Sequence, residues 1–217
     1  MQARLVVAAM LMVLAPLFCL DAATDEAGFR PLFDGQTLDG WQGDEKVFGI
    51  QDDAIVAGTL DARIPHNEFL ASREEFDDFE LRLKARLLGQ GQNAGIQFRS
   101  QRIADHFEMI GYQCDMGTAD GKPIWGALYD ESRRRKFLEL PDAEKLNAVL
   151  RAKDWNDLVI RCEGPRVQIW VNGVQTVDYT ETDESLPAKG RLGLQIHGGE
   201  PAQASYKDIR IKTLRRK

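Results

Sequence analysis

The chain has 217 residues, of which 43% are hydrophobic and 29% are charged, a balance typical of a globular protein and unlike that of a disordered one. This length suits one domain with a full hydrophobic core. The formal net charge of −6 argues against a nucleic-acid partner, because a phosphate backbone attracts a basic surface.

Residues 1–22 have the pattern of a secretory signal peptide. Arg4 supplies the positive charge, an apolar run extends from Leu5 to Leu20, and Ala22 is a small residue suited to cleavage. The run is short for a membrane anchor and no second one follows it. Cys19 would suit lipidation, but the bulky residue before it favours cleavage and release. We therefore expect a periplasmic or secreted protein with no membrane-spanning segment after processing.

Apolar and polar residues alternate along the rest of the chain with the period of two that half-buried β-strands show. The longest such stretch covers Phe79 to Leu87, and others lie at 96–98, 158–160, 167–171, 192–196 and 209–211. Asn172-Gly173 predicts a tight hairpin, because both residues tolerate positive φ. Only Asp142 to Arg151 indicates a helix. These features predict an all-β sandwich of two antiparallel sheets in a single domain, at 29–214.

The polar faces of several predicted strands carry amide, carboxyl and imidazole groups, which suit sugar hydroxyls better than a plain solvated face does. Residues two apart in a strand share a face, so Gln97 and Arg99 should both point outward opposite Ile96 and Phe98. The same rule places outward the side chains of Asn93, Gln113, Asp115, Arg191, Gln195 and His197. Trp170 is either a flat platform for a sugar ring or a side chain packed under a loop.

Cys114 and Cys162 lie in strand-like segments of the mature chain. In an oxidising compartment they are able to pair, but a buried free thiol fits either position equally well. The sequence leaves both alternatives open.

Six segments in a fixed order resemble one known family. They are Phe29–Trp41, which is similar to "LFDGxxLxGW", Asn93–Arg99, similar to "NSGIxFR", Gly111–Asp115, Trp155-Asn156, Val171–Val174 and Gly193–His197. On these residues the chain resembles the 3-keto-disaccharide hydrolase domain family over nearly the whole mature sequence. The resemblance implies a concanavalin A-like jelly roll with a concave sheet and the cleavage of 3-keto-glycosides. One position departs from the pattern, because Gly111 stands where many members have the Glu of "YExQ".

Cleavage of a 3-keto-glycoside needs a base for the C2 proton, a group that stabilises the enolate and an acid for the leaving group. His197 is the first candidate base, because imidazole titrates near neutral pH. Asp115 is the alternative base, or one ligand of a divalent cation; no cofactor is otherwise indicated.

The remaining candidates would stabilise the enolate and protonate the leaving group. Arg99, with Arg133 or Arg134, is expected to stabilise negative charge, and Tyr129 or Glu131 to donate the leaving-group proton. The predicted substrate-binding set is Gln97, Gln113, Trp125, Tyr129, Arg133, Arg134, Trp170 and Gln195. Asp130-Glu131 has a plainer alternative, an ion pair with the arginines that follow.

Two functions of different classes fit these residues. The first is an enzyme that cleaves 3-keto-glycosides, and the second is a lectin-like module that binds carbohydrate without chemistry. The ionisable set favours the enzyme, and a cell-surface interaction protein is a weaker third alternative. The sequence has no GxSxG-type elbow for a serine nucleophile, and it offers few opposed carboxylates for a retaining glycosidase. The oligomeric state is not indicated.

Overall fold

The computed structural model describes residues 26–91 and 93–214. The predicted signal peptide at 1–22 lies outside the described residues and stays a prediction. No helix in the described part of the chain is both long and apolar enough to cross a membrane.

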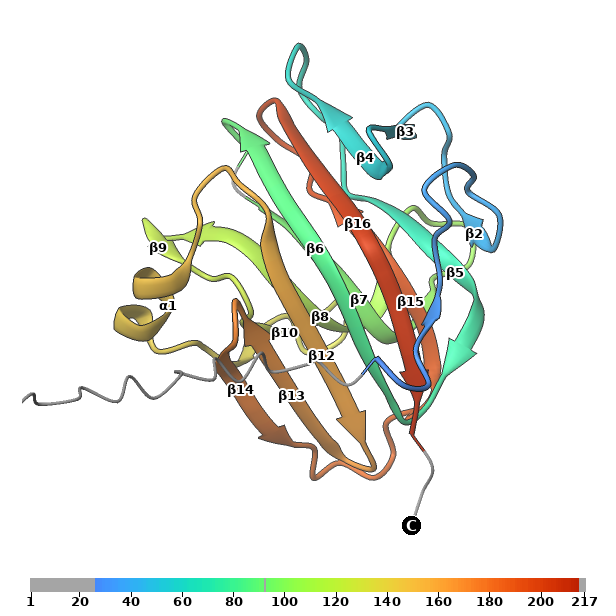
Figure 1. The fold of residues 1–217 in the computed structure, drawn as a ribbon, viewed down its shortest axis with the longest axis vertical. Helices are drawn as coiled ribbons and strands as arrows, with labels where there is room; N and C mark the ends of the chain where they lie inside the picture. Colours follow the sequence, from blue (N-terminus) through green and yellow to red (C-terminus); the bar gives the residue numbers. More distant parts are fainter. Residues whose placement is uncertain (1–25, 92, 215–217) are drawn as a thin grey trace, which may run out of the picture.

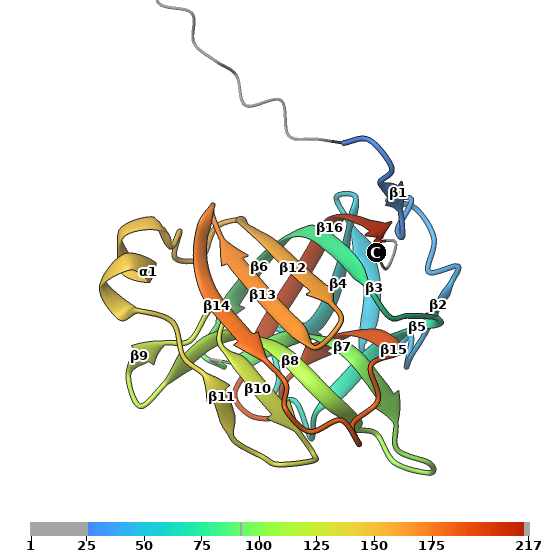
Figure 2. The ribbon, with the colours of Figure 1, turned by 90° about the horizontal axis from the view of Figure 1, so that it is seen from below.

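Two antiparallel sheets face each other as two layers, which Figure 2 shows edge-on. The first, here called sheet A, has the order β14 (Val174–Thr180), β13 (Arg166–Val171), β12 (Asn156–Glu163), β6 (Phe79–Gly89), β16 (Ala202–Thr213), β4 (Ala54–Thr59) and β3 (Phe48–Gln51), with β1 (Arg30–Pro31) beside β16. It is the nearer layer in Figure 1.

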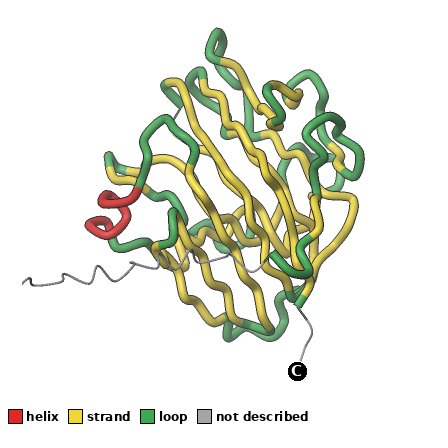
Figure 3. Tube along the Cα trace, in the orientation of Figure 1, coloured by secondary structure: helices red, strands yellow, loops and turns green. Residues whose placement is uncertain are grey.

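The second sheet, here called sheet B, has the order β11 (Phe137–Glu139), β10 (Leu128–Glu131), β8 (Met109–Ala119), β7 (Asn93–Arg102), β15 (Gly190–Ile196), β5 (Glu68–Phe76) and β2 (Trp41–Gln42), with β9 (Lys122–Pro123) beside β8. The described residues form one short helix, α1 (Ala143–Val149), which lies at the side of the sandwich (Figure 3). The predicted all-β sandwich is confirmed.

The core lies between the sheets and follows the alternation of the strands. On β6, Phe79, Leu81 and Leu83 are at most 3% exposed, while the residues between them are only partly covered. β12 pairs with β6 in a register that places Leu158 opposite Leu83 and Ile160 opposite Leu81, so the buried stripe continues across the sheet. Burial of these stripes is the main force that joins the layers.

The predicted turn and helix both form. Asn172 and Gly173 have φ of 48° and 83° and connect β13 to β14 as a hairpin. The side chain of Asp142 accepts hydrogen bonds from the backbone N–H groups of Glu144 and Lys145, which caps the start of α1.

Cys114 and Cys162 are free thiols buried in the core. Cys114 belongs to β8 of sheet B and Cys162 to β12 of sheet A. Both thiols therefore act here as small core side chains.

Arg99 is placed differently from the expectation, because a β-bulge interrupts the pairing of β7 with β8 after Phe98. Arg99 takes φ of 47°, and its side chain turns away from the face that carries Gln97. Its guanidinium donates to the carbonyl oxygens of Asp77 and Gly164 and to the Asp78 carboxylate, at 2.8–3.0 Å. The prediction that Arg99 points outward beside Gln97 is wrong; the residue forms a buried ion pair.

The Arg99–Asp78 pair leads to a prediction about stability. Both side chains are at most 3% exposed. Arg99→Met leaves the Asp78 carboxylate buried without its cation, so we expect the free energy of unfolding to fall by about 3–5 kcal/mol. Urea denaturation of the mature protein measures this change.

Arg63→Met is the matched control. Arg63 pairs with Glu200 at the surface, where its side chain is 69% exposed, and an exposed pair contributes at most about 1 kcal/mol. Equal losses of stability in the two variants would contradict the structural role given to Arg99.

Candidate functional site

A chain of hydrogen bonds crosses the outer face of sheet B, the face turned away from the core. Ser100 Oγ donates to Gln97 Oε1 at 2.5 Å, and Gln97 Nε2 donates to Gln113 Oε1 at 3.0 Å. Gln113 Nε2 then donates to Asp115 Oδ1 at 2.6 Å and to Gln195 Oε1 at 3.1 Å. We call these five residues the amide chain. Each is at most 2% exposed.

Strand register brings the amide chain together. Gln97 lies opposite Gln113 on β8, and Gly95 lies between Asp115 on one side and Gln195 on the other. A Cβ atom on Gly95 would come within 2.7 Å of the Gln113 side chain. Glycine at this position therefore leaves room for the amide that bridges the three strands.

Asp115 is the terminal acceptor of the amide chain. Burial, helped by the nearby charge of Glu131, raises the pKa of its carboxyl to about 8, although the hydrogen bond from Gln113 opposes both effects. At neutral pH the carboxyl therefore carries a proton most of the time.

Tyr129 and Glu131 reach the same face from the neighbouring strand, β10. Tyr129 lies opposite Gln113, and Glu131 lies opposite Gly111. Burial raises the pKa of Glu131, and so does the charge of Glu108. Burial also raises the pKa of Tyr129, with further contributions from the charges of Glu131 and Asp115. Tyr129 thus lies within electrostatic reach of both carboxyl groups, and Asp115 within reach of Glu131.

His197 follows β15 and is exposed. Its Nδ1 lies 2.6 Å from the carbonyl oxygen of Gly198. A carbonyl oxygen only accepts, so Nδ1 carries the proton and Nε2 keeps the basic lone pair of the neutral ring. The positive form of His197 lowers the pKa of Glu131, so the imidazole lies within electrostatic reach of that carboxyl.

We call Asp115, Tyr129, Glu131 and His197 the acid–base group. Glu131 is the central member, because its charge acts on Asp115 and it responds to the charge of His197. Perturbed carboxyl pKa values gathered on one face are typical of sites that transfer protons.

Residues 28–212 match the family model described as the 3-keto-alpha-glucoside-1,2-lyase-like domain. The chain belongs to this family. The sequence resemblance is thereby confirmed, and membership of the lyase-like family supports a function that concerns carbohydrates.

Solved structures of low identity share the fold. A proposed glycosyl hydrolase of Parabacteroides distasonis has a TM-score of 0.64 at 18% identity, with 87% of this chain and 94% of that chain covered. The carbohydrate-binding module CBM66 of Bacillus subtilis has a TM-score of 0.51 at 16% identity, with 80% and 96% covered. A galectin-like protein of unknown function from B. subtilis has a TM-score of 0.55 at 11% identity, with 87% and 96% covered. No curated protein matches the sequence.

Gly111, the position that departs from the lyase-like family pattern, accepts no larger residue in this backbone. Its φ is 149°, and a Cβ atom there would come within 2.8 Å of the Ser100 Cα atom. Glu131 is the residue directly across the ladder, on β10. The outer face thus has a carboxylate one strand away from the position where the pattern places it.

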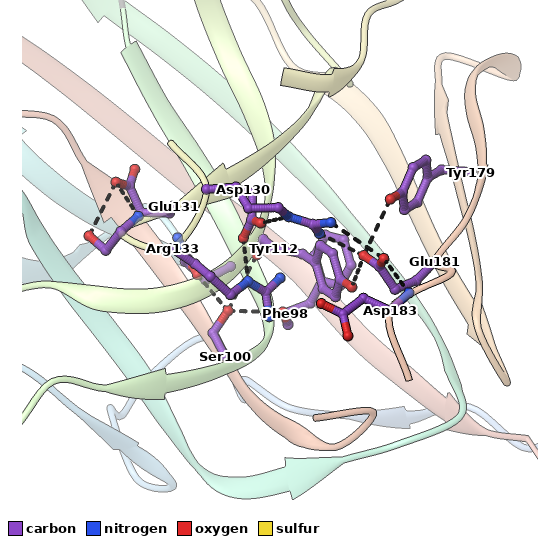
Figure 4. Close-up of polar contacts among 12 residues, drawn as sticks. Phe98, Ser100, Tyr112, Asp130, Glu131, Arg133, Tyr179, Glu181 and Asp183 are labelled. Atoms are coloured by element: carbon purple, nitrogen blue, oxygen red, sulfur yellow. Dashed lines mark hydrogen bonds and ion pairs between the residues drawn. The ribbon is translucent and has the colours of Figure 1, made fainter. Parts of the chain in front are cut away.

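Arg133 and Arg134 do not line the acid–base group. Both bind the fully buried carboxylate of Asp130, and Arg134 also binds Glu181 at 2.6 Å. Glu181 accepts a further hydrogen bond from the Tyr112 hydroxyl at 2.7 Å. Figure 4 shows Glu131 on the side of Asp130 opposite to Glu181. The plainer alternative, an ion pair between the acidic pair and the arginines that follow, therefore holds for Asp130. Glu131 is not part of this ion pair.

Both candidate tryptophans also lie outside the acid–base group. Trp125 is 7% exposed and packs in the core between the sheets. Trp170 points outward, as its strand pattern predicts, but from β13 of sheet A. A ligand on the outer face of sheet B therefore cannot stack on either ring.

Two contacts near Glu131 were not predicted from the sequence. Ser132 Oγ donates to a carboxylate oxygen of Glu108 and lies 3.4 Å from Glu131 Oε1. Glu108 belongs to the segment between β7 and β8, which has no strand pattern, so only the folded chain shows this proximity.

The described residues contain no cluster of three or more His, Cys, Asp or Glu side chains arranged to hold a metal ion. Asp115 has one oxygen engaged by Gln113, and it is largely protonated at neutral pH, which suits a hydrogen-bonding role better than metal ligation. The divalent cation stays an untested prediction.

Proposed function

We propose that this protein cleaves 3-keto-glycosides by removing the proton at C2 and expelling the substituent at C1. The observation that carries the proposal is the acid–base group, in which a carboxyl of raised pKa lies within electrostatic reach of a second carboxyl, and that carboxyl within reach of an exposed histidine. The family match supports the choice of substrate class.

His197 is the proposed base. Its Nε2 takes the C2 proton, which the C3 ketone has acidified, and the electron pair of that bond forms the enolate. Glu131 stabilises the imidazolium that results, because the two opposite charges lie within reach of each other.

Asp115 is the proposed acid. When the enolate collapses, C1 and C2 form a double bond, the C3 ketone is restored and the C1–O bond breaks. The departing oxygen takes the proton of Asp115, which the low exposure and the negative charge of Glu131 keep in place at neutral pH. Water then adds across the new double bond if the product is hydrated.

Tyr129 is the proposed donor to the enolate oxygen. Its raised pKa means that the hydroxyl keeps its proton at neutral pH. A neutral donor placed where negative charge develops lowers the barrier without itself titrating. The role first given to Arg99 thus passes to a residue of the acid–base group.

The second candidate function is carbohydrate binding without chemistry. The observation that favours it is the exposed position of His197 and the partial exposure of Tyr129, which offer a ring and hydrogen bonds to a saccharide.

The proposed reaction requires both the ketone and the C2 proton. We expect purified mature protein to release the aglycone from a 3-keto-glucoside but not from the matched ordinary glucoside. If proton removal limits the rate, deuterium at C2 slows release. The absorbance of the released aglycone measures the rate with each glucoside and the effect of deuterium. Equal cleavage of both glucosides without deuterium sensitivity would contradict the elimination, and binding of both without cleavage would favour the lectin-like alternative.

Two histidine variants complete this assay. His197→Asn should retain the fold and lose about two to four decades of turnover, the usual contribution of a general base. His66→Asn removes another exposed histidine and should retain the wild-type rate. A wild-type rate in His197→Asn would exclude His197 as the base.

Glu131→Gln tests the coupling between the two carboxyls. Asp115 must be protonated to act as the acid, so turnover should fall as pH rises through about 8. Without the negative charge of Glu131 the pKa of Asp115 is lower, so this alkaline limb should move to lower pH. Turnover is measured across pH for Glu131→Gln and for the exposed control Glu184→Gln. The pH at which turnover falls is then compared between the two variants. An unshifted limb would disprove this coupling.

We also propose that the protein is exported, on the basis of Arg4 and the apolar run that follows it. N-terminal sequencing of protein from the periplasm or medium of the native host should begin shortly after Ala22. A cytosolic protein that retains Met1 would contradict export.

A further inference from the structure

The outer face of sheet A carries a groove of about 500 Å³ on the side of the sandwich opposite to the acid–base group. Its volume lies within the range of about 300–1,000 Å³ that small-ligand sites occupy. The groove runs across strands that lie side by side in Figure 1, and its lining includes Arg82, Lys84, Asp157, Val159, Arg161 and Trp170.

Strand register sets the width of the groove. Val159 lies opposite Trp170 on one side and opposite Arg82 on the other. Neighbouring strands are about 4.8 Å apart, so Trp170 and Arg82 stand roughly 10 Å apart with a low side chain between them. Val159 is also the one apolar residue among the outward positions of β12, whose other outward residues are all charged. The groove therefore has an apolar floor at Val159 and a long side chain on either side, Trp170 and Arg82.

Trp170 differs from the other tryptophans in what its ring contacts. Trp41 donates its indole N–H to the Leu32 carbonyl, and Trp155 is covered by the cations of Arg86 and Lys207 at 4.7 and 4.4 Å. Trp125 is in the core. In the described part of the chain, no hydrogen bond, ring stacking or cation–π contact engages the indole of Trp170, which is partly exposed at the groove.

The charged groups around Trp170 largely neutralise each other. Glu80 binds Arg82 at 2.7 Å and Arg161 at 3.3 Å. Arg161 is also bound by Glu163 at 2.8 Å. Glu26 also binds Arg82 and Arg210, and Asp208 binds Lys84, so each cation that lines the groove has a carboxylate partner. These pairs hold donors and acceptors in fixed positions. The groove therefore suits a ligand that is neutral and rich in hydroxyl groups.

We propose that this groove is a second saccharide site, which binds a neutral hexose unit of a glycan without chemistry. The apolar face of the sugar ring stacks on Trp170 above Val159, and its hydroxyls bond to the guanidinium and carboxylate groups at the walls. Because the site is on sheet A, it binds independently of the reaction proposed for sheet B.

Binding to polysaccharides tests the proposal without any use of turnover. Native gel electrophoresis of the mature protein through laminarin, hydroxyethylcellulose and glycogen, with polygalacturonate as the anionic polymer, measures retardation. We expect retardation by at least one neutral glucan, unchanged by added salt. Trp170→Ala should weaken the affinity roughly tenfold or more, and Trp170→Phe should retain most of it, because a flat ring remains.

Three further variants make the result decisive. Val159→Arg keeps the indole but fills the groove from an outward position, so it should abolish retardation even if Trp170→Ala is poorly folded. Gln168→Ala alters the same face two residues from Trp170 and should bind normally, as should Asp115→Asn on the other sheet. The proposal is wrong if no neutral glucan binds, if only polygalacturonate binds in a salt-sensitive way, if Trp170→Ala and Val159→Arg bind normally, or if Asp115→Asn abolishes binding.

Discussion

The buried hydrogen bonds of the amide chain are the constraint on which the outer face of sheet B depends. An amide taken out of water without partners costs several kcal/mol, so the three neighbouring glutamines depend on the hydrogen bonds between them. Of their amide atoms, only Gln195 Nε2 has no partner among the described residues. The bonds run in one direction: Ser100 donates to Gln97, Gln97 to Gln113, and Gln113 to Asp115. This direction delivers an N–H group to the Asp115 carboxyl, and that donation moderates the effect of burial on its pKa.

The bulge in β7 gives the amide chain its first donor. Strict alternation would place Arg99 beside Gln97 and turn Ser100 to the core. Because Arg99 adopts a positive φ instead, its guanidinium pairs with Asp78 and the Ser100 hydroxyl reaches Gln97. One backbone irregularity thus removes a cation from the outer face and adds a neutral donor to it. Burial consequently dominates the pKa of Asp115, with the hydrogen bond from Gln113 opposing it and no arginine beside the carboxyl to lower that pKa.

The sequence predicts what depends on local period and misses what depends on a bulge or on topology. Alternation predicts the strands and the shared face of Gln113 and Asp115, since both follow from side chains that point to opposite faces in turn. The conformation of Arg99 has no local signal, because arginine seldom adopts positive φ. Trp170 has the predicted orientation, but its sheet depends on the pairing of β13 with β12, which alternation does not specify. Trp125 lies in a segment without strand pattern, and its burial depends on the fold around it.

The burial of the amides bears on the choice between catalysis and binding. The sequence suggested that glutamines on a polar face bind sugar hydroxyls, an argument that serves an enzyme and a lectin equally. In the folded chain Gln97, Gln113 and Gln195 bond to one another, so most of their amide groups are already engaged and offer a ligand little. Their arrangement instead fixes the position of one carboxyl. A binding module gains nothing from a carboxyl that is buried, precisely oriented and raised in pKa, whereas proton transfer requires a group whose pKa lies near the working pH. The hydrogen-bonded amide chain that holds Asp115 in place therefore favours the enzyme.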